Sequence, residues 1–502
     1  MTARDFDVAV VGGGHNALVA AGLLQRRGAR VALFEARPQL GGFASPLALG
    51  EGVEVPLAVD DWGLVRDDLL AELELERHGL AWAPAEALAA LRSEATDGDA
   101  DLVLWREAGR CAASFEQDAP GDGKRLRRFL AEIGGLVGEL EELWRRPPEL
   151  RQLARFVLSP ELLRWCGGSL EELLGAAFDG TRARTAFGAL ALRGSAWGPS
   201  AAGTGILLLH QLAGTTAEGL RVARRPRGGA GAFVAALERS AADAGVQMAT
   251  GAPVRQILVE NVAGGSRAVG LRLANGTEVS ARCVLSGLDR RTTLLDLVGP
   301  ARLPVQSVRR LRHLRHHGVR GRAIVPVAKR AGPALATGEP GVPLLVARGL
   351  EQLERAADDA KWGRSSARPW LEVSVWPGRA GGTTWTINAQ CAPQSGSATT
   401  DGAWASGLRA AIEGVGSGAE LAPWRDLTPA DWERELGAAG GCEHHGDMLL
   451  DQLFQLRGTE RAAGARTELQ GLLLCGSGAH PGGAVTGLPG WHAAELAPEE
   501  LG

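Results

Sequence analysis

The N-terminal segment limits the fold more than any other part of the chain. Residues 6–35 read FDVAVVGGGHNALVAAGLLQRRGARVALFE. The apolar run from Val8 to Val11 predicts a strand buried on both faces, and a helical pattern follows it until Gly28. A second apolar run ends on Glu35. This order of strand, glycine turn, helix and strand predicts the first unit of a dinucleotide-binding domain.

Each motif position in the turn between the first strand and the helix can be explained by its role in binding a dinucleotide. The turn fits G-x-G-x-x-[GA] and consists of Gly12, Gly13, Gly14, His15, Asn16 and Ala17. Gly12 permits the tight turn, Gly14 lets the backbone approach a pyrophosphate, and Ala17 keeps helix and sheet close. The helix N-terminus offers N–H groups to phosphates. Glu35 is placed to accept hydrogen bonds from ribose hydroxyls.

The residues after the second strand favour FAD over NAD. Ala36 and Arg37 follow Glu35 directly, and a glycine pair stands at Gly41 and Gly42. Such a pair lets a second loop approach the cofactor, as in FAD enzymes whose dinucleotide domain is continued by distant segments. An acid at the end of the second strand would repel the 2′-phosphate of NADP. We therefore predict FAD as the cofactor.

Later parts of the chain are predicted to continue the same domain. Residues 224–286 predict a glycine-rich loop, an amphipathic helix, two strands, a hairpin that turns at Asn275-Gly276 and a further strand. A buried strand is predicted again just before Gly476. The predicted fold class is α/β, a discontinuous FAD-binding Rossmann-like domain of the glutathione reductase type with an inserted α+β substrate domain. We expect FAD-binding parts at 1–75, 225–295 and 440–502, and substrate-domain parts at 76–224 and 296–439.

Composition excludes several other classes of protein. The net charge of −4 over 502 residues argues against a nucleic-acid partner. The six cysteines are scattered without a C-x-x-C pair, which argues against a redox dithiol and a cysteine zinc site, and we predict no metal. The N-terminus does not have the pattern of a signal peptide. Residues 194–217 lack charge, but Gly, Ser, Thr and Pro interrupt them too often for a membrane-spanning helix. We therefore expect a cytoplasmic protein.

Four blocks of sequence resemble the phytoene desaturase-like superfamily of FAD oxidoreductases, and within it most closely the branch named pyridine nucleotide-disulfide oxidoreductase domain-containing protein 2. The blocks cover most of the chain in the expected order, and the last is the most specific to that branch. They are VVGGGHNALVAAGLLQRRGARVALFEARPQLGG (10–42), WGPSAAGTGILLLHQ (197–211) with RPRGGAGAFVAAL (225–237), CVLSGLDRRTTLLDLVG (283–299), and HHGDMLLDQLFQLRG (444–458) with LLLCGSGAHPGGAVTGLPGWHAA (472–494).

The resemblance implies further cofactor contacts and a class of reaction. The backbone of Val254 would meet the adenine, and the final turn would pass the flavin end of FAD. The residues implied in that turn are Gly476, Ser477, Gly478, Gly483, Val485 and Gly487. The family implies dehydrogenation or isomerisation of an apolar substrate, such as a polyene, an isoprenoid or a lipid. Flavin would accept the hydride, and a quinone or oxygen would be the terminal oxidant.

Two residues are candidates for the chemistry itself. A histidine or an acid near the flavin could stabilise developing charge or take a proton, and we select His480 and Asp447. His444 and His445 are predicted to be structural. Residues 309–317, RRLRHLRHH, predict a basic surface, with a peripheral membrane contact as the alternative.

Two other functions stay open from the sequence. A flavin amine oxidase shares the fold, although such enzymes usually carry Arg directly after the glycine pair, where this chain has Phe43. An FAD-binding scaffold without turnover is the third hypothesis, because the fingerprint predicts binding and not catalysis. The oligomeric state is left unknown.

Overall fold

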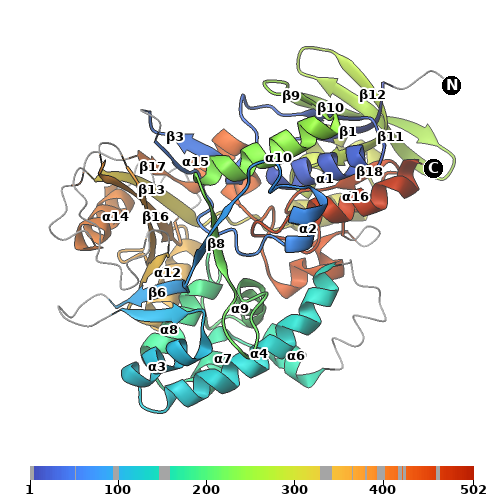
Figure 1. The fold of residues 1–502 in the computed structure, drawn as a ribbon. Helices are drawn as coiled ribbons and strands as arrows, with labels where there is room; N and C mark the ends of the chain where they lie inside the picture. The colour runs from blue at the N-terminus through green and yellow to red at the C-terminus, as the bar shows by residue number, and fades with distance from the viewer. Residues whose placement is uncertain are drawn as a thin grey trace.

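Two seven-stranded sheets organise the part of the chain that the structure describes (Figure 1). The structure is a computed structural model. It describes residues 5–50, 53–93, 101–145, 159–327, 342–364, 366–378, 381–392, 402–415, 421, 425–459 and 464–501. Among these residues, no helix is both long and apolar enough to cross a membrane.

The first sheet draws its strands from three distant parts of the chain. The parallel strands are β9 (Gln247–Ala249), β2 (Val31–Phe34), β1 (Phe6–Val11), β12 (Glu278–Ser286) and β18 (Leu472–Leu474). The hairpin of β10 (Val254–Val262) and β11 (Gly265–Leu273) extends this sheet through β12. The helices α1 (His15–Arg26), α10 (Ala230–Ala244) and α16 (Leu488–Leu501) pack together beside it (Figure 1). The predicted discontinuous Rossmann-like fold is confirmed.

Strand β12 differs from its prediction in one respect. The sequence suggested a hairpin strand followed by a separate strand, but residues 278–286 form one continuous strand. Its first half pairs antiparallel with β11 across the turn at Asn275-Gly276, and its second half pairs parallel with β1. Gly276 has φ +88°, and the Asn275 side chain accepts a hydrogen bond from the backbone N–H of Thr277. The two patterns belong to one strand because its two ends have different neighbours.

The second sheet is mostly antiparallel and belongs to the other half of the molecule. In spatial order it contains β17 (Arg425–Leu427), β13 (Arg320–Val327), β16 (Thr383–Gln390), β15 (Leu371–Pro377), β14 (Leu344–Val346), β6 (Ala87–Arg92) and β7 (Leu102–Trp105). Two short ribbons, β3 (Pro46–Ala48) with β4 (Glu54–Pro56) and β5 (Trp82–Ala85) with β8 (Ala223–Pro226), complete the strands. The polar residues that matter below lie on β13, β15 and β16.

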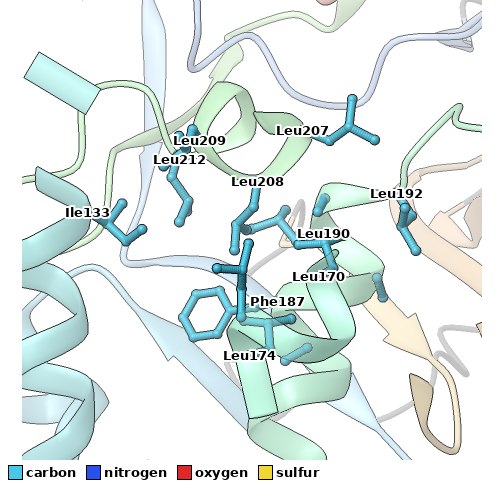
Figure 2. Packing of buried hydrophobic residues seen from close by; sticks show 14 of the residues in the cluster. Ile133, Leu170, Leu174, Phe187, Leu190, Leu192, Leu207, Leu208, Leu209 and Leu212 are labelled. Atoms are coloured by element: carbon cyan, nitrogen blue, oxygen red, sulfur yellow. The ribbon is translucent and has the colours of Figure 1, made fainter. Parts of the chain in front are cut away.

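A body of helices packs against this second sheet (Figure 1). It contains α3 (Ala108–Asp118), α4 (Asp122–Arg145), α6 (Pro160–Gly167), α7 (Leu170–Ala177), α8 (Thr181–Ala191) and α9 (Gly205–Gln211). Figure 2 shows part of its core, where Phe187 of α8, Leu208 of α9 and Ile133 of α4 belong to one buried cluster. The uncharged stretch 194–217 contains α9, whose side chains from Ile206 to His210 are buried. Burial of this many leucines explains why the stretch lacks charge without spanning a membrane.

Among the described residues, the other α-helices are α2 (Asp67–Glu72), α11 (Val305–His313), α12 (Leu350–Lys361), α14 (Gly402–Val415) and α15 (Pro429–Leu436). The predicted basic surface at 309–317 is only partly exposed. His316 is buried with its ring 3.6 Å from the carboxylate of Asp289, and His317 donates to Asp447 at 2.7 Å. The arginine-rich pattern hid these contacts because their acidic partners lie far away in the sequence.

Candidate active site

A large cavity lies where the two halves of the molecule meet. One side is formed by the glycine turn after β1 and by the final turn before α16. The other side is formed by side chains from β13, β15, β16 and nearby loops. The enclosed space, including its opening, is about 1290 Å³. A site between domains is where ligands most often bind, so the cavity is the candidate site.

The glycine turn has the geometry that its sequence predicted. Gly12 has φ +85°, which permits the tight turn out of β1. Helix α1 begins at His15, so the first N–H groups of the helix lack intrahelical partners and face the cavity. A Cβ built on Gly14 would meet no atom within 4 Å, so the space in front of this backbone is open. The turn can therefore hold a pyrophosphate.

The second glycine pair brings another loop against the first. The N–H of Gly41 donates to the carbonyl of Gly13 at 2.8 Å. A Cβ on Gly42 would stand 3.2 Å from the Cα of Gly14, and one on Gly41 would stand 2.7 Å from Val234. Two loops can approach this closely only because glycine occupies both positions.

Glu35 stands at the end of β2 with its carboxylate lining the cavity. One oxygen accepts from the N–H of Gly13 at 2.6 Å and the other from the N–H of Arg37 at 2.8 Å. Each carboxylate oxygen has further lone pairs for a ribose hydroxyl. The carbonyl of Glu35 accepts from the N–H of Ala252, two residues before Val254, so the segment implied for the adenine lies beside this corner.

The final turn contributes the far end of the same cavity wall. Gly476, Ser477, Ala484 and Val485 line it, and the side chain of Asn16 donates to the hydroxyl of Ser477 at 3.4 Å. Gly476 lies against the backbone of Gly287, whose carbonyl oxygen would stand 2.2 Å from an added Cβ. The N- and C-terminal motifs are thus parts of one site.

Several buried polar atoms around the cavity lack a hydrogen-bond partner among the described residues. They are His15 Nε2, Asn16 Oδ1, His444 Nδ1 and His445 Nδ1. Buried polar atoms are normally hydrogen-bonded, so these atoms indicate a missing polar ligand. The open glycine turn, the carboxylate of Glu35 and these atoms together fit FAD.

His444 and His445 line the cavity, although the sequence assigned them only a structural role. Burial lowers the pKa of His445 to about 4, and burial likewise lowers the pKa of His444. Both rings are therefore neutral at pH 7. His445 has φ +53°, a left-handed conformation that is uncommon for a residue other than glycine. Such strain often marks a functional position.

The wall opposite the glycine turn is charged and buried. Arg322 holds Asp60 with two hydrogen bonds of 2.7 and 3.0 Å, and Arg221 donates to Asp61 at 2.5 Å. The Arg322 guanidinium keeps Asp60 ionised and its pKa at about 2, against a burial effect that acts in the opposite direction. Two further ion pairs line the same wall, Arg193 with Glu372 at 2.9 Å and Arg320 with Glu443.

The structure brings most of the predicted cofactor residues to the cavity. Those that line it are Gly12, Gly13, Gly14, His15, Asn16, Ala17, Glu35, Arg37, Gly42, Gly476, Ser477 and Val485. The predicted residues that stand behind the lining are Ala36, Gly41, Val254, Gly478, Gly483 and Gly487. Gly483 supports the site indirectly, because a Cβ there would stand 2.2 Å from the His444 ring.

The two residues that the sequence analysis selected as candidates for the chemistry, His480 and Asp447, do not line the cavity. His480 is 1% exposed, and its Nε2 donates to the carbonyl of Leu143 at 2.8 Å, at the end of α4. Asp447 accepts from the backbone and ring of His317 at 2.9 and 2.7 Å. The local sequence could not show this, because both partners lie more than a hundred residues away.

Sequence reasoning missed the charged wall altogether. Its charged residues come from the loop after β4, from β13 and β15, and from the segments that follow α8, α9 and α15. The available signal was alternation within strands that otherwise read as apolar, such as Arg320 and Arg322 in RGRAIVPV or Glu372 in LEVSVWP. A charge inside a buried strand requires a partner and marks a site worth testing.

A cavity of this kind at the carboxyl ends of a Rossmann-like sheet defines an FAD-binding flavoprotein. Two family models agree with that class. A model described as NAD(P)-binding Rossmann-like domain matches residues 10–60, and one described as flavin containing amine oxidoreductase matches residues 89–329. The chain is an FAD-dependent oxidoreductase of the superfamily that includes flavin amine oxidases and desaturases.

Relatives and solved structures agree with this assignment. Pyridine nucleotide-disulfide oxidoreductase domain-containing protein 2 of Mus musculus is 28% identical over 99% of this chain and 94% of its own. Hydroxyneurosporene desaturase of Cereibacter sphaeroides is 32% identical over 58% of each chain. An oxidoreductase from Methanosarcina mazei has the same fold with a TM-score of 0.66 at 14% identity, covering 98% of this chain and all of that one. A variant of putrescine oxidase has a TM-score of 0.65 at 17% identity, covering 98% of each chain.

Proposed function

We propose that this enzyme removes two hydrogens from a substrate that has both a hydrocarbon part and a polar group, and leaves a new double bond. The supporting observation is the two-sided cavity. On the side of the glycine turn, the cavity lining includes the apolar side chains Phe43, Val59 and Leu64. The inner wall, which is the wall opposite the glycine turn, contains the buried ion pairs. A wholly apolar polyene, the expectation from the family resemblance, would leave that wall without a polar partner. One relative is named a desaturase of hydroxyneurosporene.

The chain's own residues would bind and orient the reactants. FAD, when bound, supplies the hydride acceptor. The glycine turn and the N-terminus of α1 would hold its pyrophosphate, and Glu35 would hold a ribose. Phe43 and Leu64 would exclude water from the reacting carbon. This arrangement orients the substrate and removes solvent, which are the contributions expected of the protein in a flavoenzyme.

The second hydrogen leaves as a proton and needs an acceptor. His444 and His445 line the cavity, are neutral at pH 7 and each have an Nδ1 without a partner among the described residues. A neutral imidazole is a common proton acceptor. We propose that one of these two rings takes the proton, in place of His480, and that a quinone or oxygen reoxidises the enzyme.

Oxidation of an amine is the second candidate, and one observation favours it. Four carboxylates lie on or behind the inner wall, and a carboxylate attracts a protonated amine. Each of the four is already paired with an arginine, which weakens that attraction.

The test is anaerobic reduction of the purified, FAD-loaded protein. A panel would contain hydrocarbon substrates with a hydroxyl or carboxylate, polyenes without a polar group, and primary amines. We expect the flavin absorbance to bleach with the first group and the product to contain one more double bond, seen by mass spectrometry as a loss of two hydrogens. Bleaching only by amines would establish the second candidate. No bleaching by any donor, in a protein that dithionite reduces normally, would favour a scaffold role.

A further inference from the structure

Nine charged residues lie on or behind the inner wall of the cavity, and they comprise five arginines and four carboxylates. The nine charged residues are Arg193, Arg221, Arg225, Arg320, Arg322, Asp60, Asp61, Glu372 and Glu443. Four arginines are paired with the four carboxylates in ion pairs. The fifth, Arg225, is buried, with its guanidinium 4.2 Å from the ring of Trp376 and a hydrogen bond of 3.3 Å to Ser374. The set as a whole therefore carries one more positive than negative charge, although Arg225 and Arg322 stand behind the residues that line the cavity.

The other two charged residues that line the cavity cancel each other. Glu35 and Arg37 lie together at the glycine turn and balance each other. The neighbouring ring of His444 is neutral at pH 7, because burial lowers its pKa. An uncompensated charge is costly to bury, so a wall of this composition is more stable when an anion completes it.

Two arginines that line the cavity also have unused hydrogen-bond donors. Arg193 follows α8, and its side chain is 9% exposed; Arg320 begins β13, and its side chain is 13% exposed. The Nε–H of each has no acceptor among the described residues, although both guanidinium groups take part in ion pairs. Both side chains line the cavity. Buried N–H groups of this kind normally have an acceptor.

We propose that the polar group of the substrate is a carboxylate, and that Arg193 and Arg320 bind it. This proposal rests on the proposed function and names its substrate class, a hydrocarbon acid. Guanidinium groups match a carboxylate in shape and charge better than any other side chain does. The apolar side chains Phe43, Val59 and Leu64 would then contact the hydrocarbon part, between the carboxylate and the cofactor side.

The experiment measures binding, so it does not depend on turnover. The FAD-loaded protein is titrated with octanoate, octylamine and octanol, and binding is followed by calorimetry and by the change in the flavin spectrum. We expect octanoate to bind at least about tenfold more tightly than octylamine and octanol, which is the scale of one charge-assisted contact. Octylamine binding more tightly than octanoate would overturn the proposal.

Two substitutions by glutamine change the charge of the wall in opposite directions. Arg193→Gln removes the surplus charge and one donor, and should weaken octanoate binding about tenfold or more. Glu372→Gln increases the surplus and releases Arg193 from its partner, and should tighten binding. This second variant keeps the test decisive if the first one folds poorly. The control is Arg355→Gln on the exposed surface of α12, which should change nothing.

The result separates this proposal from the proposed function. If octanoate affinity is the same in both variants and in the parent protein, the carboxylate site is wrong. The dehydrogenase assignment would still stand if another class of donor bleaches the flavin in the reduction experiment. If no donor reduces the flavin but octanoate binds as expected, the anion site stands and the proposed reaction fails.

Discussion

At the scale of single residues, the cofactor half of the site depends on where two backbones touch. Gly41 and Gly42 have φ +108° and +58°, and they bring one loop against Gly13 and Gly14. A side chain at either position would meet a strained backbone and occupied space. The sequence predicted this contact because the glycine pair lies within the same βαβ unit as the turn that it meets.

Gly41→Ala is expected to lower both FAD content and stability. The new Cβ would stand 2.7 Å from Val234 and would push the loop away from the glycine turn. The matched control is Gly28→Ala, because Gly28 also has a positive φ, +93°, but its Cβ would meet nothing within 4 Å. The control should cost only the left-handed strain of about 1–2 kcal/mol. Flavin absorbance per protein and thermal melting would measure the difference, and equal FAD content in the two variants would contradict the contact.

At the scale of elements, the final turn joins the FAD-binding half to the helical body. His480 donates to the carbonyl of Leu143, and Nε2 of His492 donates to the carbonyl of Arg145 at 2.6 Å. Their rings stack with centroids 5.5 Å apart. The two histidines thus satisfy carbonyl groups at the end of α4, which have no partner within the helix itself. His480 holds the end of α4 and does not line the cavity.

His480→Gln and His480→Ala should therefore behave differently. The amide of Gln can still donate to the Leu143 carbonyl, so we expect near-normal flavin reduction and a small loss of stability. Ala removes the donor and leaves a cavity, which should cost about 2–4 kcal/mol. Chemical denaturation and single-turnover reduction would measure both effects. If the Gln variant is stable but its rate of flavin reduction falls a hundredfold, His480 takes part in the reaction itself.

At the scale of the whole molecule, many buried histidines make the fold sensitive to acid. Burial lowers the pKa of His15, His210 and His445 to about 4 and that of His480 to about 3, and it also lowers the pKa of His444 and His492. Above pH 6.5 these rings are neutral in both the folded and the unfolded state. Below that pH the unfolded chain binds protons that the folded chain does not, so stability must fall as the pH falls.

Thermal melting between about pH 7.5 and about pH 5 should show this loss, because each such ring costs roughly 1 kcal/mol per pH unit below its unfolded pKa. Carboxyl groups contribute little in this range, since arginines hold the pKa of Asp60 and Asp61 low. His210→Gln should make the pH dependence shallower. The exposed His313→Gln should not change it, and equal slopes for the two variants would contradict the assignment.

The sequence by itself determined the cofactor half of this protein. The glycine turn, Glu35 and the glycine pair are contiguous, and their function depends on backbone geometry that a few neighbouring residues specify. The final turn was identified by resemblance to a family, and the structure places Gly476 and Ser477 in the same cavity. Fold class and cofactor were therefore predictable.

Only the tertiary structure decided what lies opposite the cofactor. The charged wall joins residues that are more than a hundred positions apart, such as Asp60 with Arg322 and Arg193 with Glu372. An isolated arginine or aspartate in a sequence predicts a solvated surface, because exposure is the usual state of a charge. Folding pairs these groups inside the molecule, where water no longer screens them, so their positions depend on contacts that no local stretch of sequence specifies.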